Sequence, residues 1–178
     1  MSRTNPNKKK RRSANKTVLI YGEGLAEEIF IKYLRGIYTF NTNVAITVRR
    51  GKEGTADGIV MHAHKTQGAF NKRIVVLDND KPKREMEKAR ILGNEENIIL
   101  CKNTPCLESL LLSILNKGKS FANKTSNWCK KEFESRYIDN KKRGDSDCFT
   151  KLFPKKLLNE MRRKIPELDN IVCIMEGK

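Results

Sequence analysis

Carboxylates follow two short apolar segments of this sequence, at positions where a β-strand would end. Glu23 comes just after residues 17–21, and Asp78 and Asp80 come just after residues 73–77. Short β-branched runs of this kind are typical of buried parallel strands. In an open α/β sheet, ligands bind just beyond the carboxyl ends of the strands. Because Mg²⁺ prefers oxygen ligands from a few carboxylates, the pattern predicts a divalent metal site.

Asp78 and Asp80 are separated by a single residue, Asn79. Side chains alternate along an extended chain, so these two carboxylates are expected on the same side. Two like charges this close raise the pKa of at least one of them unless a cation lies between them. The alternative is a turn built from Asp and Asn, without a metal.

Two glutamates extend this acidic pattern. Glu27 follows Glu23 by four residues, one helical turn, so both side chains can face the same way. Glu108 lies at the start of an otherwise apolar helix expected over 107–115. The alternative for each glutamate is a first-turn acid that complements the helix dipole.

The elements that must position these acids alternate between strand and helix patterns up to residue 116. This alternation favours a parallel sheet with crossover helices. The expected strands are 17–21, 44–49, 73–78 and 97–101, and the expected helices are 25–37, 55–67, 82–92 and 107–115. Beyond residue 117 the patterns are weaker. They predict a short helix at 128–137, a basic amphipathic helix at 148–164 and a possible last strand at 170–174.

Length and composition limit the class of protein. A chain of 178 residues with 38% hydrophobic residues predicts one domain with a modest core. No apolar stretch approaches the length of a membrane span, and residues 1–16 lack the apolar region of a secretory signal. Five cysteines without a C-x-x-C pair fit a reducing compartment. We therefore expect a cytoplasmic protein without a disulfide framework.

The net charge of +16 is unevenly distributed. Residues 1–16 carry 7 Lys and Arg and no acid, and residues 117–164 carry 15 Lys and Arg against 6 Asp and Glu. Residues 17–116 are nearly neutral, with 14 against 12. Such a basic surface suits nucleic acid, although it can also serve only solubility. Residues 1–16 are expected to be disordered, either as a nucleic-acid arm or as a solvated tail.

Three acidic motifs together resemble those of a known family. They are the E-G-x-x-E turn from Glu23 to Glu27, the D-x-D of Asp78 and Asp80, and the P-C-x-E that ends at Glu108. This combination resembles the RloB-like group of Toprim-fold proteins, which is related to the Toprim half of OLD-type nucleases. The resemblance covers residues 17–116 well and the remainder loosely.

The resemblance implies a single Toprim-like domain over 17–178. Its α/β fold would contain a parallel sheet of about four to five strands flanked by helices. Residues 17–116 would form the metal-site core, and 117–178 would form a basic helical extension with the possible last strand.

The resemblance also implies an activity, which is metal-dependent hydrolysis of phosphodiester bonds in RNA, such as tRNA, or in DNA. Proteins of this family commonly act in bacterial antiphage defence. One Mg²⁺ or Mn²⁺ would lie on Glu23 and Glu27 and a second on Asp78 and Asp80, with Glu108 completing the site.

Several basic residues would accompany the acids. OLD-type enzymes use a lysine after the last acid, and Lys142 or its neighbour Lys141 is the best candidate here. Substrate contacts are expected from Lys141 and Arg143 and, in the loop after the second strand, from Arg50 and Lys52.

Partners follow from what the sequence lacks. No G-x-x-x-x-G-K-[ST] motif occurs, so any ATPase partner must be a separate protein. A homodimer is possible, because apolar positions in the expected 148–164 helix would need a cover. Two alternatives to a defence nuclease stay open. They are a non-catalytic nucleic-acid-binding subunit of a defence complex and an RNA-processing endonuclease.

Overall fold

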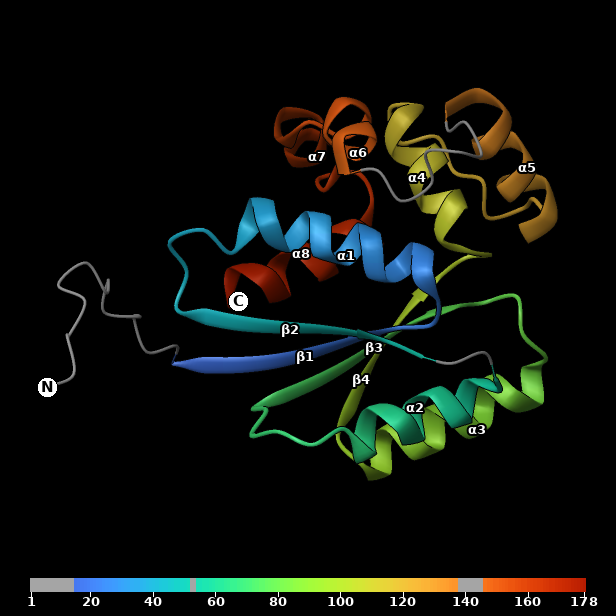
Figure 1. Cartoon of the computed structure of the whole chain (residues 1–178). Helices are drawn as coiled ribbons and strands as arrows, with labels where there is room; N and C mark the ends of the chain where they lie inside the picture. The colour runs from blue at the N-terminus through green and yellow to red at the C-terminus, as the bar shows by residue number, and fades with distance from the viewer. Residues whose placement is uncertain (1–14, 52–53, 138–145) are drawn as a thin grey trace, which may run out of the picture.

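The structure is a computed structural model that describes residues 15–51, 54–137 and 146–178. Its centre is one sheet of four parallel strands in the order β2-β1-β3-β4 (Figure 1). The strands are β1 (Lys16–Gly22), β2 (Val44–Arg50), β3 (Lys72–Asp78) and β4 (Ile98–Asn103). The α/β class and the parallel sheet predicted from sequence are therefore confirmed, with four strands in the described part of the chain.

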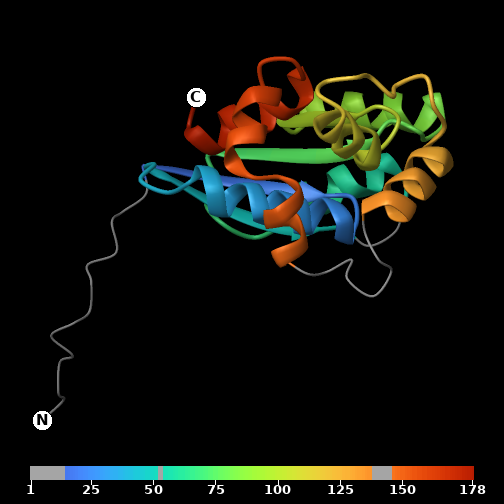
Figure 2. The ribbon, with the colours of Figure 1, turned by 90° about the horizontal axis from the view of Figure 1, so that it is seen from above.

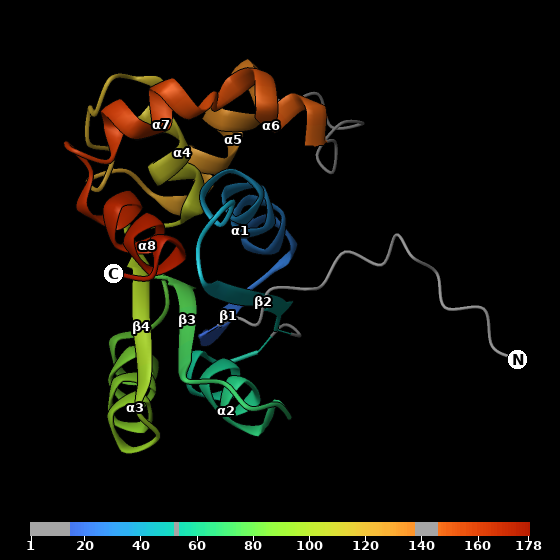
Figure 3. The same ribbon diagram turned by 90° about the vertical axis from the view of Figure 1, so that its left-hand side faces the viewer.

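Helices cover both faces of this sheet. The first four helices are α1 (Leu25–Tyr38), α2 (Ala56–Lys65), α3 (Lys83–Glu95) and α4 (Leu107–Leu115). The remaining four are α5 (Ser126–Tyr137), α6 (Ser146–Leu152), α7 (Lys155–Met161) and α8 (Pro166–Glu176). Helices α1 and α8 lie side by side over one face, and α2 and α3 cover the other (Figures 1 and 2). Viewed from the side, α4 to α7 lie above α1, mostly on its side away from the sheet (Figure 3).

The central strands are apolar on both faces because both faces are covered. In β1, Val18 and Ile20 belong to the core under α1 and α8, whereas Leu19 and Tyr21 belong to the core under α2 and α3. This two-sided burial explains why the sequence of β1 is a continuous apolar run rather than an alternating one.

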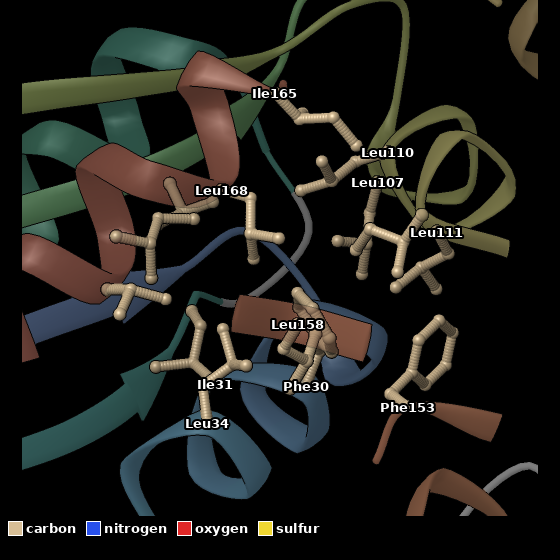
Figure 4. Close-up of a cluster of buried hydrophobic side chains, with 14 of the residues drawn as sticks. Phe30, Ile31, Leu34, Leu107, Leu110, Leu111, Phe153, Leu158, Ile165 and Leu168 are labelled. Carbon is tan, nitrogen blue, oxygen red and sulfur yellow. The ribbon is translucent and has the colours of Figure 1, made fainter. Parts of the chain in front are cut away.

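The C-terminal helices contribute to the same core as the sheet. Phe153 is fully buried, and its ring centroid lies 5.9 Å from that of Phe30 in α1 and 6.5 Å from that of Phe133 in α5. Leu158 and Leu168 join this cluster with Leu107 of α4 (Figure 4). Residues on both sides of position 117 therefore share one hydrophobic core.

The predicted single helix over 148–164 is wrong. The structure has α6 and α7 there, separated at Pro154, which caps the start of α7. Proline lacks a backbone N–H and cannot continue a helix, so it ends the first segment. The apolar side chains of this region are covered by the chain itself, including Phe149, Phe153, Leu158 and Met161. The reason given for a homodimer is therefore also wrong.

The possible last strand at 170–174 is wrong as well. These residues lie inside α8, where Leu168, Ile171, Val172 and Met175 are buried at helical spacing. Pro166 occupies the first helical turn, a position that tolerates its missing N–H. A short apolar run does not by itself distinguish a buried helix face from a strand.

Part of the predicted basic surface lies outside the described residues. This is so for residues 1–14, for Lys52, and for Lys141, Lys142 and Arg143. Lys16, which the sequence places in the tail, is the first residue of β1. Within the described part of the chain, no helix has the length and apolarity needed to cross a membrane.

Candidate functional site

The turn from β1 into α1 is unusually tight, and Gly22 makes it possible. A Cβ atom at Gly22 would lie 2.8 Å from the Cβ of Glu27, too close for any other residue without a shift. The next residue, Glu23, donates its backbone N–H to the carbonyl of Val76 at 3.1 Å. The first turn of α1 is therefore held directly against the ends of β1 and β3.

Glu27 is buried in this turn, with 6% of its surface exposed. Its Oε2 accepts a hydrogen bond from the backbone N–H of Gly24 at 2.9 Å, which caps α1. Glu27 is therefore an acid in the first turn of a helix, which is the alternative to a metal ligand that the sequence left open. This contact engages one oxygen of the carboxylate.

Asp78 connects the end of β3 to the start of α4. It is 6% exposed, and its Oδ1 accepts a hydrogen bond from the backbone N–H of Leu107 at 2.9 Å. The backbone N–H of Asp78 donates in turn to Oε2 of Glu23 at 3.1 Å. Three separate elements therefore meet at this aspartate.

Glu108 lies in the first turn of α4, one residue beyond the N–H that Asp78 accepts from. Its Oε2 is buried and has no hydrogen-bond partner among the described residues. Leaving a charged acceptor buried and unpaired is costly, so such an atom calls for a ligand. A cation or an N–H donor would meet this need.

Within the described part of the chain, Glu23 is the acid of this group that forms an ion pair. Its Oε1 lies 2.8 Å from Nζ of Lys81, which follows the D-x-D motif. Burial works against the charge of Lys81, but Glu23 and the neighbouring acids outweigh it and raise the lysine pKa. Lys81 therefore holds a positive charge where the sequence predicts a metal.

These four acids influence one another strongly enough to be treated as one carboxylate cluster, formed by Glu23, Glu27, Asp78 and Glu108. The pKa of Asp78 is raised to about 8, mainly by burial and then by the charges of Glu27, Glu108 and Glu23. Burial also raises the pKa of Glu27, with smaller contributions from Glu108 and Glu23. A cation among them would favour the ionised forms and reverse these shifts.

Asp80 does not join this cluster. It is exposed in the turn after β3, whereas Asp78 is buried, so the predicted pairing of the two aspartates on one side is not what the structure shows. The reason is that the chain turns immediately after Asp78 and no longer alternates as a strand. The charge of Asp80 is instead felt by Lys81 and Lys130.

The donor set suits a hard divalent cation, but the present side-chain positions do not form a finished site. No group of three or more His, Cys, Asp and Glu side chains is arranged to hold a metal ion in the ranges that the structure describes. The contacts to Gly24, Leu107 and Lys81 occupy oxygens of Glu27, Asp78 and Glu23. Metal binding would require Lys81 to move, while the free oxygen of Glu108 is ready to coordinate.

One basic residue near the cluster was not predicted from sequence. The positive charge of Lys130 in α5 acts against the raised pKa of Asp78 and offsets part of the increase. Burial opposes the charge of Lys130, but Glu108 and Asp78 outweigh it and raise the lysine pKa. The only hint in the sequence is its position beside Cys129, which lies on the buried face of α5. The lysine predicted at 141 or 142 lies outside the described residues.

Arg50, a predicted substrate contact, is exposed at the end of β2. Its Nε lies 3.6 Å from Oε2 of Glu28, the residue after Glu27 in α1. Because the Arg50 side chain is exposed and the contact is long, the pair contributes little to stability, and Arg50 can exchange Glu28 for a phosphate at small cost. Arg50 thus lies at the same edge of the sheet as the carboxylate cluster.

The fold and the site together define an α/β protein with buried carboxylates at the carboxyl ends of parallel strands, the place where such sheets bind ligands. No protein-family model, curated protein or solved structure was found to match this chain. The function is therefore argued from the site itself.

Proposed function

We propose that this protein is a divalent-metal-dependent nuclease that hydrolyses phosphodiester bonds in RNA or DNA. The observation that carries the proposal is that four acids, from the β1–α1 turn, α1, β3 and α4, influence one another at one edge of the sheet. One of them, Glu108, has a buried Oε2 without a hydrogen-bond partner among the described residues. Packing alone does not explain four acids gathered in one place, two of them buried. Hard oxygen donors are the ligands that Mg²⁺ and Mn²⁺ prefer.

The residues divide into two roles in this proposal. Glu23, Glu27, Asp78 and Glu108 hold one or two metal ions, with Asp80 available from the neighbouring turn. A bound metal supplies a nucleophilic water or stabilises the leaving oxygen. Lys130 and Arg50 bring positive charge near the carboxylate cluster and would orient the phosphate.

The net charge of +16 supports a polyanionic substrate. The acids lie in the nearly neutral part of the chain, and most of the excess charge lies elsewhere. This division is suited to a protein that binds metal in one region and phosphate in another.

The resemblance of the three acidic motifs to RloB-like Toprim proteins places this proposal in a biological setting. On that basis we propose a Toprim-type nuclease that acts in the cytoplasm as an effector of antiphage defence. Its activity would be controlled by a separate partner such as an ATPase. An RNA-processing endonuclease would use the same chemistry on a different RNA.

A second candidate is a nucleic-acid-binding subunit without catalysis. The ion pair between Lys81 and Glu23 favours it, because a lysine can neutralise the cluster permanently without a metal. In that case the carboxylates would be structural, and the basic surface alone would carry the function.

Cleavage of labelled tRNA, single-stranded DNA and plasmid, with and without Mg²⁺ or Mn²⁺, distinguishes the two candidates. We expect metal-dependent products from the wild type and none from Asp78→Asn. Glu87→Gln, which alters an exposed acid of α3, is the matched control and should cut normally. Retention of nucleic acid in a gel without product under every metal would favour the binding subunit.

A further inference from the structure

An apolar pocket of about 180 Å³ lies beside the carboxylate cluster. Leu25, Ala26 and Ile29 of α1 form one wall, and Leu107, Glu108 and Leu111 of α4 form another. Phe133 and Glu134 of α5 and Phe149 of α6 complete the lining. These helices surround the same end of the sheet in Figures 1 and 3.

The pocket and the cluster share a wall. Glu108 belongs to both, and Leu25 and Ala26 precede Glu27 in the first turn of α1. A molecule with a charged group on the cluster therefore has its neighbouring atoms at the pocket entrance. Leu25 is 55% exposed there, which leaves a large apolar side chain in contact with solvent.

The lining selects among possible occupants. Aromatic and aliphatic side chains favour a flat apolar body, but the carboxylates of Glu108 and Glu134 disfavour a purely hydrocarbon group. A nucleobase meets both requirements, since it has an apolar face for stacking and polar N–H groups at its edge. Lys130 and Arg50 near the cluster add the positive charge that the adjoining phosphate needs.

We propose that this pocket receives one unstacked nucleobase from the strand whose phosphate lies on the carboxylate cluster. The substrate is then single-stranded or locally opened nucleic acid, because a base in a continuous duplex cannot leave its stack without an energetic cost. This inference rests on the proposed nuclease function, and it specifies the substrate class.

The first test compares substrates rather than variants of the protein, so folding does not affect it. Wild-type protein with Mg²⁺ or Mn²⁺ is given an oligonucleotide as a single strand, as a continuous duplex, and as a single strand with one abasic position scanned across the cleavage site. We expect the single strand to be cut at least about tenfold faster than the duplex, and one abasic position to slow cutting by about tenfold. Equal rates of cleavage on all three substrates would overturn the proposal that the pocket receives a base.

The second test fills the pocket. Ala26→Phe adds a ring at an exposed position of α1, and Gly36→Phe adds the same ring near the other end of that helix, where nothing lies within 4 Å. We expect Ala26→Phe to lose the preference for a single strand over its abasic counterpart, and Gly36→Phe to retain it. Thermal unfolding of both variants verifies that they are folded.

A binding measurement separates failure of this inference from failure of the proposed function. Asp78→Asn protein is titrated with a single strand that carries a fluorescent base analogue, and the emission change reports unstacking. A change that Ala26→Phe abolishes, in a protein whose wild type cuts nothing, would support the pocket and reject the nuclease. Cleavage by the wild type without any emission change at any position would retain the nuclease and reject the pocket.

Discussion

The carboxylate of Asp78 accepts the backbone N–H of Leu107 at 2.9 Å, across 29 residues of sequence. A residue at the end of a strand thereby caps the start of the helix that follows the neighbouring strand. The same aspartate has its pKa raised to about 8, chiefly by burial and then by three neighbouring acids. Asp78 thus makes a structural contact but carries a charge that burial disfavours. Substitution by Asn removes the charge and keeps the acceptor, whereas substitution by Ala removes both.

Asp78→Asn should retain the fold, because the amide oxygen can still accept the N–H of Leu107. Asp78→Ala removes this acceptor and should be less stable than Asp78→Asn by about 1 kcal/mol, as for loss of a helix cap. Urea denaturation of the two variants measures the difference. Equal stability of the two variants would mean that the contact to Leu107 contributes nothing to folding. In a cleavage assay, both variants should be inactive.

Lys81→Gln should increase the affinity for Mg²⁺, because the lysine competes with the metal for Glu23. The expected gain is several-fold, measured as a larger rise in melting temperature at the same Mg²⁺ concentration. Lys83→Gln, two residues away and exposed, is the control for the loss of one positive charge. A smaller response to Mg²⁺ in Lys81→Gln than in Lys83→Gln would contradict competition.

Glu176→Gln should reduce stability at neutral pH by about 2 kcal/mol, the contribution of a hydrogen bond between charged groups. Glu176 accepts two hydrogen bonds from Arg162, at 2.7 Å on Oε1 and 3.1 Å on Oε2. The hydrogen bonds to Arg162 are the largest cause that lowers the pKa of Glu176 to about 2. A lowered pKa means that the folded state favours the ionised form. The stabilisation is therefore complete above the unfolded pKa, near 4.5, and disappears as the pH falls through about 2.

Chemical denaturation of the wild type and of Glu176→Gln at a series of pH values tests this dependence. The two proteins should differ at pH 7 and converge as the solution is acidified below the pKa of an ordinary glutamate. A difference that stays constant down to pH 2 would show that the ionic contact is not its cause.

Phe153→Ala should destabilise the whole protein by about 3–5 kcal/mol, the usual cost of removing a buried aromatic ring. Phe153 is fully buried among the rings of Phe30, Phe133 and Phe149. Phe40→Ala, at a position that is 82% exposed, is the matched control and should change stability by less than about 0.5 kcal/mol. A single cooperative transition in Phe153→Ala, shifted as a whole, would show that the C-terminal helices unfold together with the sheet.

The described residues between 17 and 116 were predictable because their local patterns are strong. Buried parallel strands give continuous apolar runs, and the helices between them repeat at helical spacing, so the order of elements and the positions of Glu23 and Asp78 at strand ends were correct. The strand boundaries differ from those predicted by one or two residues.

The C-terminal part was less predictable because its elements are short and depend on tertiary contacts. The apolar run at 171–174 suits a strand as well as a helix. Packing of α8 against β4 and α1 decides between them and buries Ile171 and Val172. Pro154 was present in the sequence as a signal to divide the helix at 148–164, and the prediction did not use it.

The site was predictable as a set of acids but not in its detailed contacts. The pairing of Lys81 with Glu23 and the approach of Lys130 to Asp78 join elements that are distant in the chain. Charge patterns along a sequence do not identify such partners, because any of many lysines could have been chosen. The separation of Asp80 from Asp78 likewise depends on where the strand stops, which is the least reliable feature of a sequence-based prediction.

Nζ of Lys16 donates to the carbonyl oxygen of Gly177 at 2.9 Å, so the start of β1 and the end of the chain meet at the amino ends of the strands. The carboxylate cluster lies at the opposite ends. With 7 residues in β1, the separation is one strand length, about 20 Å. A tether or fluorescent reporter attached after Lys178 would therefore leave the acidic edge accessible, and the protein can be immobilised through that end for surface-based binding measurements.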